Sequence, residues 1–134
     1  MGSGGLRRLL LLGLLVPLAA GCGSGHSTST ASGGEAARWV EVERLPKQAV
    51  PGAELFKSKG CLTCHRYAGS GHTLLAAPDL TAVGTRKYGI RFQIAHLRCP
   101  SCVIPGSTMP PSASLGEKRL RQLAVFLEAS KGTH

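Results

Sequence analysis

Apolar residues recur at helical spacing in three stretches of the chain, which predicts three amphipathic α-helices. The first covers residues 51–59, opens on a proline and closes before a glycine, as helix ends prefer. The second covers residues 86–98, and the third covers residues 114–131 with apolar positions at i, i+3, i+4 and i+7. We expect the last helix to cross the first one at Ala53 and Phe56. The pattern predicts an all-α fold.

The segments outside these helices lack a helical period. Residues 23–37 are rich in glycine, serine and threonine, which is typical of a flexible tether, and His26 within them is expected to be solvated. Residues 38–51 are interpreted as a short extended piece that lies on the domain. Residues 66–83 are expected to form an irregular functional loop. The folded domain is placed at residues 51–134.

The chain begins with the features of an export signal. Two arginines precede an apolar run that is too short for a comfortable membrane span, and small residues follow, so residues 1–21 are predicted to be a signal peptide. The residues up to Cys22 look like a bacterial lipoprotein cleavage site, although alanine stands where leucine is more common. The cysteine thiol would take a diacylglycerol and anchor the protein to the extracytoplasmic (periplasmic) face of a bacterial membrane. Residues 22–50 are then the lipidated N-terminus, tether and lead-in; an ordinary secretory cut after Ala20 is the alternative.

The net charge is +9 over 134 residues. The basic residues do not cluster along the sequence as a nucleic-acid-binding stripe requires, so we expect no nucleic-acid partner. Two interpretations stay open: a solvated basic surface, or electrostatic steering towards an acidic redox partner or an anionic membrane face. The mature domain is small, and a buried cofactor would supply apolar volume that its core lacks.

The sequence Cys61-Leu62-Thr63-Cys64-His65 has the spacing C-x-x-C-H, which is the attachment signature of c-type haem. The spacing has a chemical reason, because two thiols this close can each form a thioether to a vinyl group on the same edge of one porphyrin. His65 is then held against the iron as proximal axial ligand through a neutral imidazole nitrogen. The motif predicts one covalently bound haem.

Met109 is the only methionine after the initiator, and it lies in a proline-rich segment at residues 99–111. A rigid loop of this kind can aim a thioether at a metal, and a methionine ligand raises the reduction potential of haem iron. We therefore expect Met109 opposite His65. His72 is a rival ligand, for which a surface loop position is the preferred interpretation. His96 is expected on the solvent side of its helix.

Several short motifs follow one another in a fixed order over residues 51–131. They are Gly52 and Phe56, the C-x-x-C-H motif, Pro78-Asp79-Leu80, Pro105-Gly106-Ser107-Thr108-Met109-Pro110 and a closing helix with Phe126. Together they resemble the class I c-type cytochromes, which are small mono-haem proteins. The resemblance implies a small cytochrome c fold, with three to four helices around one covalent haem c. It implies Cys61 and Cys64 as thioether sites, His65 and Met109 as axial ligands, and Pro78 and Leu80 beside the cofactor.

The resemblance also implies a second contact and a function. The carbonyl of Pro78 is expected to accept a hydrogen bond from the far nitrogen of His65. Two protein axial ligands leave no iron site for a substrate, so the protein is expected to be an electron carrier and not an enzyme. Its partners would be a redox donor, a redox acceptor and the membrane that holds the lipid anchor. The haem edge near Cys61 and Cys64 is the expected route for electrons, and a haem subunit of a larger oxidoreductase or oxidase complex is a variant of this function.

Cys99 and Cys102 depart from the family pattern. A disulfide that stiffens the approach to Met109 and a thiol redox switch are the two interpretations of this pair. A competing class is a zinc-binding module in which Cys61, Cys64 and this pair supply four thiolates. The long spacing between the pairs and the predicted export argue against it. A thiol–disulfide oxidoreductase, or a haem catalyst with an open iron site, is a weaker interpretation still.

Overall fold

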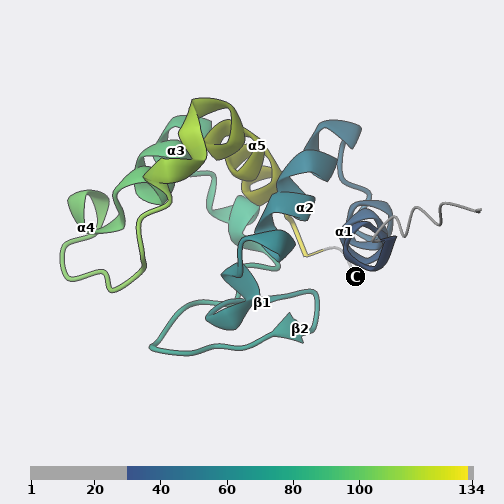
Figure 1. The fold of residues 1–134 in the computed structure, drawn as a ribbon, viewed down its shortest axis with the longest axis horizontal. Coiled ribbons are helices and arrows are strands. Elements are labelled where there is room, and N and C mark those ends of the chain that lie inside the picture. The colour runs from purple at the N-terminus through teal and green to yellow at the C-terminus, as the bar shows by residue number, and fades with distance from the viewer. Residues whose placement is uncertain (1–29, 133–134) are drawn as a thin grey trace, which may run out of the picture.

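The computed structural model describes residues 30–132, which are mostly helical (Figure 1). The α-helices are α1 (Thr30–Val42), α2 (Val50–Ser58), α3 (Ile90–Arg98), α4 (Pro100–Val103) and α5 (Gly116–Ala129). Short 3₁₀ turns cover Lys47–Ala49, Cys61–Thr63, Val83–Arg86 and Ala113–Leu115. Two short antiparallel strands, β1 (Arg66–Tyr67) and β2 (Ser70–Gly71), form a hairpin. The expected all-α class is confirmed.

Three predicted features precede the described part of the chain: the signal peptide, the Cys22 lipidation site and His26. Within residues 30–132, no helix has the length and apolar character needed to cross a membrane.

The three helices predicted from apolar periodicity are present as α2, α3 and α5. The helix α3 begins at Ile90, four residues later than expected at residue 86. The reason is Gly89, whose φ of 85° lies outside the right-handed helical region. The residues before it form the separate 3₁₀ turn Val83–Arg86.

The helices α2 and α5 cross at Gly52. A Cβ atom at this position would overlap the carbonyl oxygen of Gln122 and lie 2.6 Å from the Cβ of Phe126. Ala53 and Phe56 of the same helix are buried. The expected crossing of the first and last predicted helices is therefore confirmed, and glycine permits this close approach of the two backbones because it has no side chain.

The expectation of an extended segment at residues 38–51 is wrong, because α1 continues to Val42. The same helix includes residues 30–37, which the composition assigned to a tether. Ala36, Trp39 and Val40 are buried and follow the i, i+3, i+4 spacing of a helix face. This face packs against α2, so residues before the expected domain boundary contribute to the core.

Four aromatic side chains pack together in the core, with ring centroids between 4.8 and 6.4 Å apart: Trp39, Phe56, Tyr67 and Phe126. Tyr67 also makes a buried hydrogen bond of 2.9 Å to the hydroxyl of Ser130. The Ser130 hydroxyl donates its single proton to the carbonyl oxygen of Phe126, so Tyr67 is the donor to Ser130. The bond connects β1 to the C-terminal end of α5.

Replacing Tyr67 with phenylalanine is expected to lower the free energy of unfolding by about 1 kcal/mol, because one buried hydrogen bond is lost. Burial raises the pKa of Tyr67 above 10.0, so the folded protein holds the phenol proton more tightly than the unfolded chain. The stability that depends on this proton is complete below pH 10.0 and falls as the pH rises above it. Urea unfolding of both proteins across this range should show a smaller alkaline loss in Tyr67→Phe; parallel alkaline profiles would contradict the assignment.

Candidate functional site

The C-x-x-C-H motif forms one tight turn directly after α2. Gly60 ends the helix in the left-handed conformation, with φ of 76°, and the 3₁₀ turn begins at the next residue. The backbone N–H groups of Cys64 and His65 both donate to the carbonyl oxygen of Cys61, at 3.3 and 2.9 Å. Cys61 and Cys64 are free, half-buried thiols. The turn therefore presents two thiols and one imidazole from a single short loop.

The β1–β2 hairpin closes against this turn. Gly71 has a φ of 83°, and a Cβ there would overlap the carbonyl oxygen of His65 and lie 2.8 Å from the side chain of Leu62. The backbone N–H of His72 donates to the carbonyl oxygen of Leu62 at 3.2 Å. Since the adjacent Tyr67 is anchored in the core, the hairpin fixes the backbone of the motif.

The ring of His65 is oriented by the following loop. Its Nδ1 lies 3.0 Å from the carbonyl oxygen of Pro78, which is the expected hydrogen bond. A carbonyl only accepts, so Nδ1 carries the proton and the lone pair of the neutral ring is on Nε2. The loop is itself held, because the N–H of Leu80 donates to the carbonyl oxygen of Arg66 at 2.9 Å.

Met109 lies in the loop between α4 and α5, where it is half-buried and packs against the hydrophobic core. Leu80 packs against the same core from the loop after the motif. The far end of the Met109 loop is tied to α3, because the N–H of Ser112 donates to the carbonyl oxygen of Leu97 at 2.8 Å. His72, the rival ligand, is exposed.

His96 is half-buried, so the expectation that it lies on the solvent side of its helix is only partly met. Its Nδ1 is buried and has no hydrogen-bond partner among the described residues, and its ring stacks on Phe92 with the centroids 6.0 Å apart. Burial lowers the pKa of His96. A buried polar atom without a protein partner is rare, and a bound water, ion or cofactor is the usual explanation.

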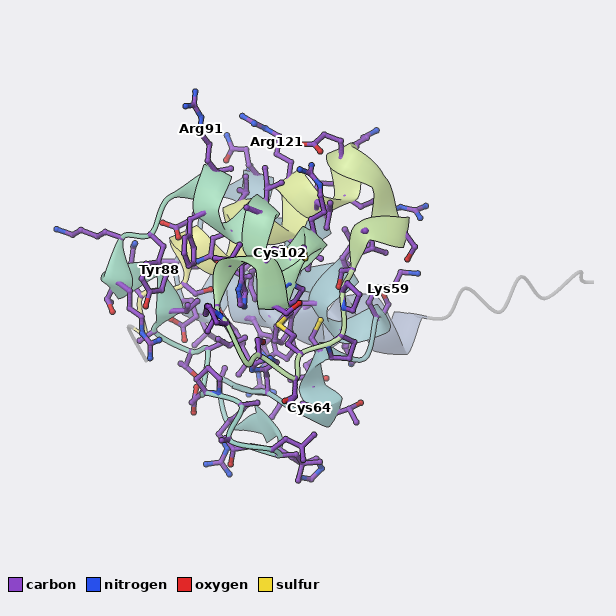
Figure 2. All side chains as sticks on the ribbon, turned by 90° about the vertical axis from the view of Figure 1, so that its left-hand side faces the viewer. Lys59, Cys64, Tyr88, Arg91, Cys102 and Arg121 are labelled. Atoms are coloured by element: carbon purple, nitrogen blue, oxygen red, sulfur yellow. A yellow bond between two sulfur atoms is a disulfide. The ribbon has the colours of Figure 1, made fainter. Side chains whose placement is uncertain are left out.

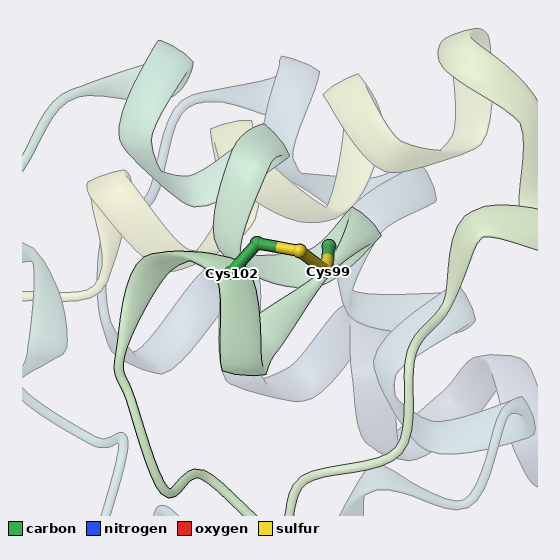
Figure 3. Close-up of a disulfide and its surroundings, with 2 residues drawn as sticks. All are labelled: Cys99 and Cys102. Atoms are coloured by element: carbon green, nitrogen blue, oxygen red, sulfur yellow. A yellow bond between two sulfur atoms is a disulfide. The ribbon is translucent and has the colours of Figure 1, made fainter.

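Cys99 and Cys102 form a disulfide at the junction of α3 and α4 (Figure 3). The N–H of Cys99 donates to the carbonyl oxygen of Ala95 at the end of α3, and Pro100 opens α4. The two C-x-x-C sequences therefore differ in state, because the first holds free thiols and the second a disulfide. A four-thiolate zinc site needs all four cysteines reduced and together, and no group of three or more potential metal ligands occurs within residues 30–132.

Burial raises the pKa of the Cys61 thiol to about 11. At neutral pH this side chain is a thiol and not a thiolate. Cysteines that exchange disulfides are activated by a lowered pKa. The environment of Cys61 is therefore opposite to that of a thiol–disulfide oxidoreductase.

Two residues that shape the site are not identified by the sequence motifs. Tyr67 follows the motif by two residues, and its isolation between a basic residue and small residues is the only local sign that it is an anchor. His96 follows Phe92 by one helical turn. This spacing places the two rings on one side of α3, and it is the sequence feature from which their stacking can be predicted.

No protein-family model, curated protein or solved structure matches this chain.

Proposed function

We propose that the protein is a one-electron carrier with a single covalent haem c, of the class I c-type cytochrome kind that its motifs resemble. The proposal assigns Cys61 and Cys64 to the thioethers and His65 and Met109 to the iron. It places the domain on the extracytoplasmic face of a bacterial membrane, anchored through Cys22.

The hydrogen bond from His65 Nδ1 to the Pro78 carbonyl carries the proposal. A histidine that ligates a metal commonly donates its other ring N–H to a carbonyl, which fixes both the tautomer and the ring orientation. Here that arrangement occurs in the residue directly after two free thiols.

The residues around the motif fit a bound haem. The buried Nδ1 of His96 has no hydrogen-bond partner within residues 30–132, which is compatible with a cofactor that contributes the missing contact. The small core, in which Cys61, Leu62, Leu80 and Met109 are only partly buried, has apolar surface left to cover. Haem bound here would supply reversible one-electron chemistry at iron.

The chain's own residues would perform two tasks at the iron in this function. His65, held by Pro78, offers a neutral Nε2 as a permanent ligand. Met109 offers a soft thioether from a loop whose end is tied to α3. Two such ligands leave no open iron position, so the proposal is electron transfer and not catalysis.

A haem subunit of a larger oxidoreductase or oxidase complex remains the second form of the same proposal. The disulfide argues against the zinc-binding alternative, because it withdraws two of the four required thiolates.

The test is an absorption spectrum of the oxidised and dithionite-reduced protein, produced in a host with haem-attachment machinery, beside a haem stain on a denaturing gel. A sharp reduced α band and a stain that survives denaturation are expected. A colourless protein without stain would overturn the proposal.

Replacing Met109 with alanine is expected to keep the haem stain and to abolish the weak near-infrared sulfur-to-iron band of the oxidised protein. The reduction potential should fall, because a thioether ligand favours the ferrous state. The matched control is His72→Ala, which removes the exposed rival ligand and should leave the band in place. Loss of the band in His72→Ala but not in Met109→Ala would contradict the assignment.

A further inference from the structure

The positive charge of this protein is concentrated in one part of the chain. Between residues 84 and 121 there is one acidic residue, Glu117, and there are seven basic ones. The seven are all exposed: Arg86, Lys87, Arg91, Arg98, Lys118, Arg119 and Arg121. In residues 30–83, by contrast, six basic residues are nearly balanced by five acidic ones. These seven residues are spread over α3, α5 and the segment before α3, so the fold decides which of them share one surface.

The fold joins part of this charge into one surface. Arg91 and Arg98 lie two turns apart on the same stripe of α3. Arg98 pairs with Glu117 of α5, and Arg121 follows Glu117 by one turn on α5. Figure 2 shows Arg91 and Arg121 projecting from neighbouring helices at the same end of the molecule. We call Arg91, Arg98 and Arg121 the α3–α5 basic face.

The α3–α5 basic face lies away from the haem-attachment motif. In Figure 2, Arg91 and Arg121 stand at the top and Cys64 near the bottom. Figure 1 is related to it by a rotation about the vertical axis, and it likewise places α3 and α5 above the β1–β2 hairpin that closes on the motif. Both views therefore place the α3–α5 basic face and the C-x-x-C-H motif at opposite ends of the molecule.

This separation distinguishes the two anionic partners that the charge alone allows. The choice between these partners rests on the proposed function, in which electrons leave near Cys61 and Cys64. An acidic redox protein bound to the α3–α5 basic face would be held far from that edge. A lipid surface needs no electronic contact, and anionic headgroups attract clustered basic residues within a Debye length.

We infer that the α3–α5 basic face lies against an anionic phospholipid surface and so turns the Cys61 and Cys64 end outward, towards redox partners. The lipid on Cys22 would keep the domain near the membrane, and the basic face would set its orientation there. Arg91 and Arg121 have no ion-pair partner within residues 30–132, so their charges are available to headgroups.

The experiment measures co-sedimentation of the full chain carrying Cys22→Ser, which removes acylation, with two kinds of vesicle. Binding is expected to vesicles of phosphatidylglycerol mixed with phosphatidylcholine and not to phosphatidylcholine alone. The double variant Arg91→Gln/Arg121→Gln should bind about 30-fold more weakly, because each basic residue near an anionic surface contributes about a fivefold factor. Salt at about 1 M should abolish binding, because the Debye length is then about 3 Å.

The matched control is Lys47→Gln/Lys59→Gln, which removes the same charge from exposed positions outside the α3–α5 basic face. It should bind nearly as well as the parent. Equal losses in the two double variants would mean that net charge alone drives binding and would overturn the inference. A second outcome would also overturn the inference. If the Arg91→Gln/Arg121→Gln variant binds vesicles as well as the parent but is reduced more slowly by an acidic redox protein, the α3–α5 basic face binds that protein and not the lipid.

The outcome is separable from the proposed function. Vesicle binding does not require haem, whereas the haem stain reports attachment alone. A stained protein that ignores anionic vesicles would overturn the inference and leave the electron carrier intact. If the protein is unstained but binds vesicles through Arg91 and Arg121, lipid binding by the α3–α5 basic face is supported. The proposed function is then overturned, and with it the redox reason for the orientation.

Discussion

The double variant Cys61→Ser/Cys64→Ser is expected to lose all haem stain on a denaturing gel. Serine has no thiol to add to a vinyl group, so neither covalent bond can form. The hydroxyl is close in size to the thiol and both positions are only half-buried, so the two substitutions by themselves add little strain. The stain is read on a denaturing gel, so it reports the covalent bond and not the fold.

The chain provides its own matched control in the second C-x-x-C sequence. Cys99→Ser/Cys102→Ser removes two cysteines at the same spacing, but these two form the disulfide beside α4. This variant should keep its haem stain. Its near-infrared sulfur-to-iron band should weaken, because the disulfide stiffens the start of the loop that carries Met109. Stain retained without Cys61 and Cys64, or lost without Cys99 and Cys102, would contradict the assignment of the two pairs.

Gly52→Ala is expected to lower the free energy of unfolding by about 2 kcal/mol, which is within the range for overpacked sites. The added methyl group would meet the backbone carbonyl of Gln122 and the Cβ of Phe126, and neither atom can rotate away. The helices α2 and α5 would have to separate. Urea unfolding measured by circular dichroism should show a lower midpoint with little change in slope.

Gly34→Ala is the control for this prediction. Gly34 also lies in a helix, α1, but nothing lies within 4 Å of the added Cβ. The same change should therefore stabilise the protein by up to about 1 kcal/mol, because alanine loses less backbone entropy in a helix than glycine. Opposite signs at the two glycines are the expected result. Equal destabilisation by Gly52→Ala and Gly34→Ala would contradict the claim that the close approach of α2 and α5 requires glycine at position 52.

Local sequence determined the parts of this protein that depend on neighbouring residues. The three helices with a clear apolar stripe are present, and the stripe decides which face of each is buried. The C-x-x-C-H motif consists of five consecutive residues, so it can be recognised without a fold. The bond between His65 and Pro78 was also anticipated, although only through the family resemblance.

Tertiary structure alone decided features in which distant segments meet. The composition does not predict helix α1, because most of its first five residues are glycine, serine and threonine. It is supported by Trp39, which packs against Phe56, Tyr67 and Phe126 from three other segments. Short helices are marginal in isolation, so packing and not composition makes this one.

The same distinction explains His96 and the α3–α5 basic face. Helical periodicity places His96 beside the buried stripe of α3, but it cannot tell whether a second element covers that side. Likewise, charges on α3 and α5 form one surface only because the fold sets the two helices side by side. Sequence determines which face each helix presents, whereas packing determines what that face meets, because contacts between distant residues depend on the whole chain.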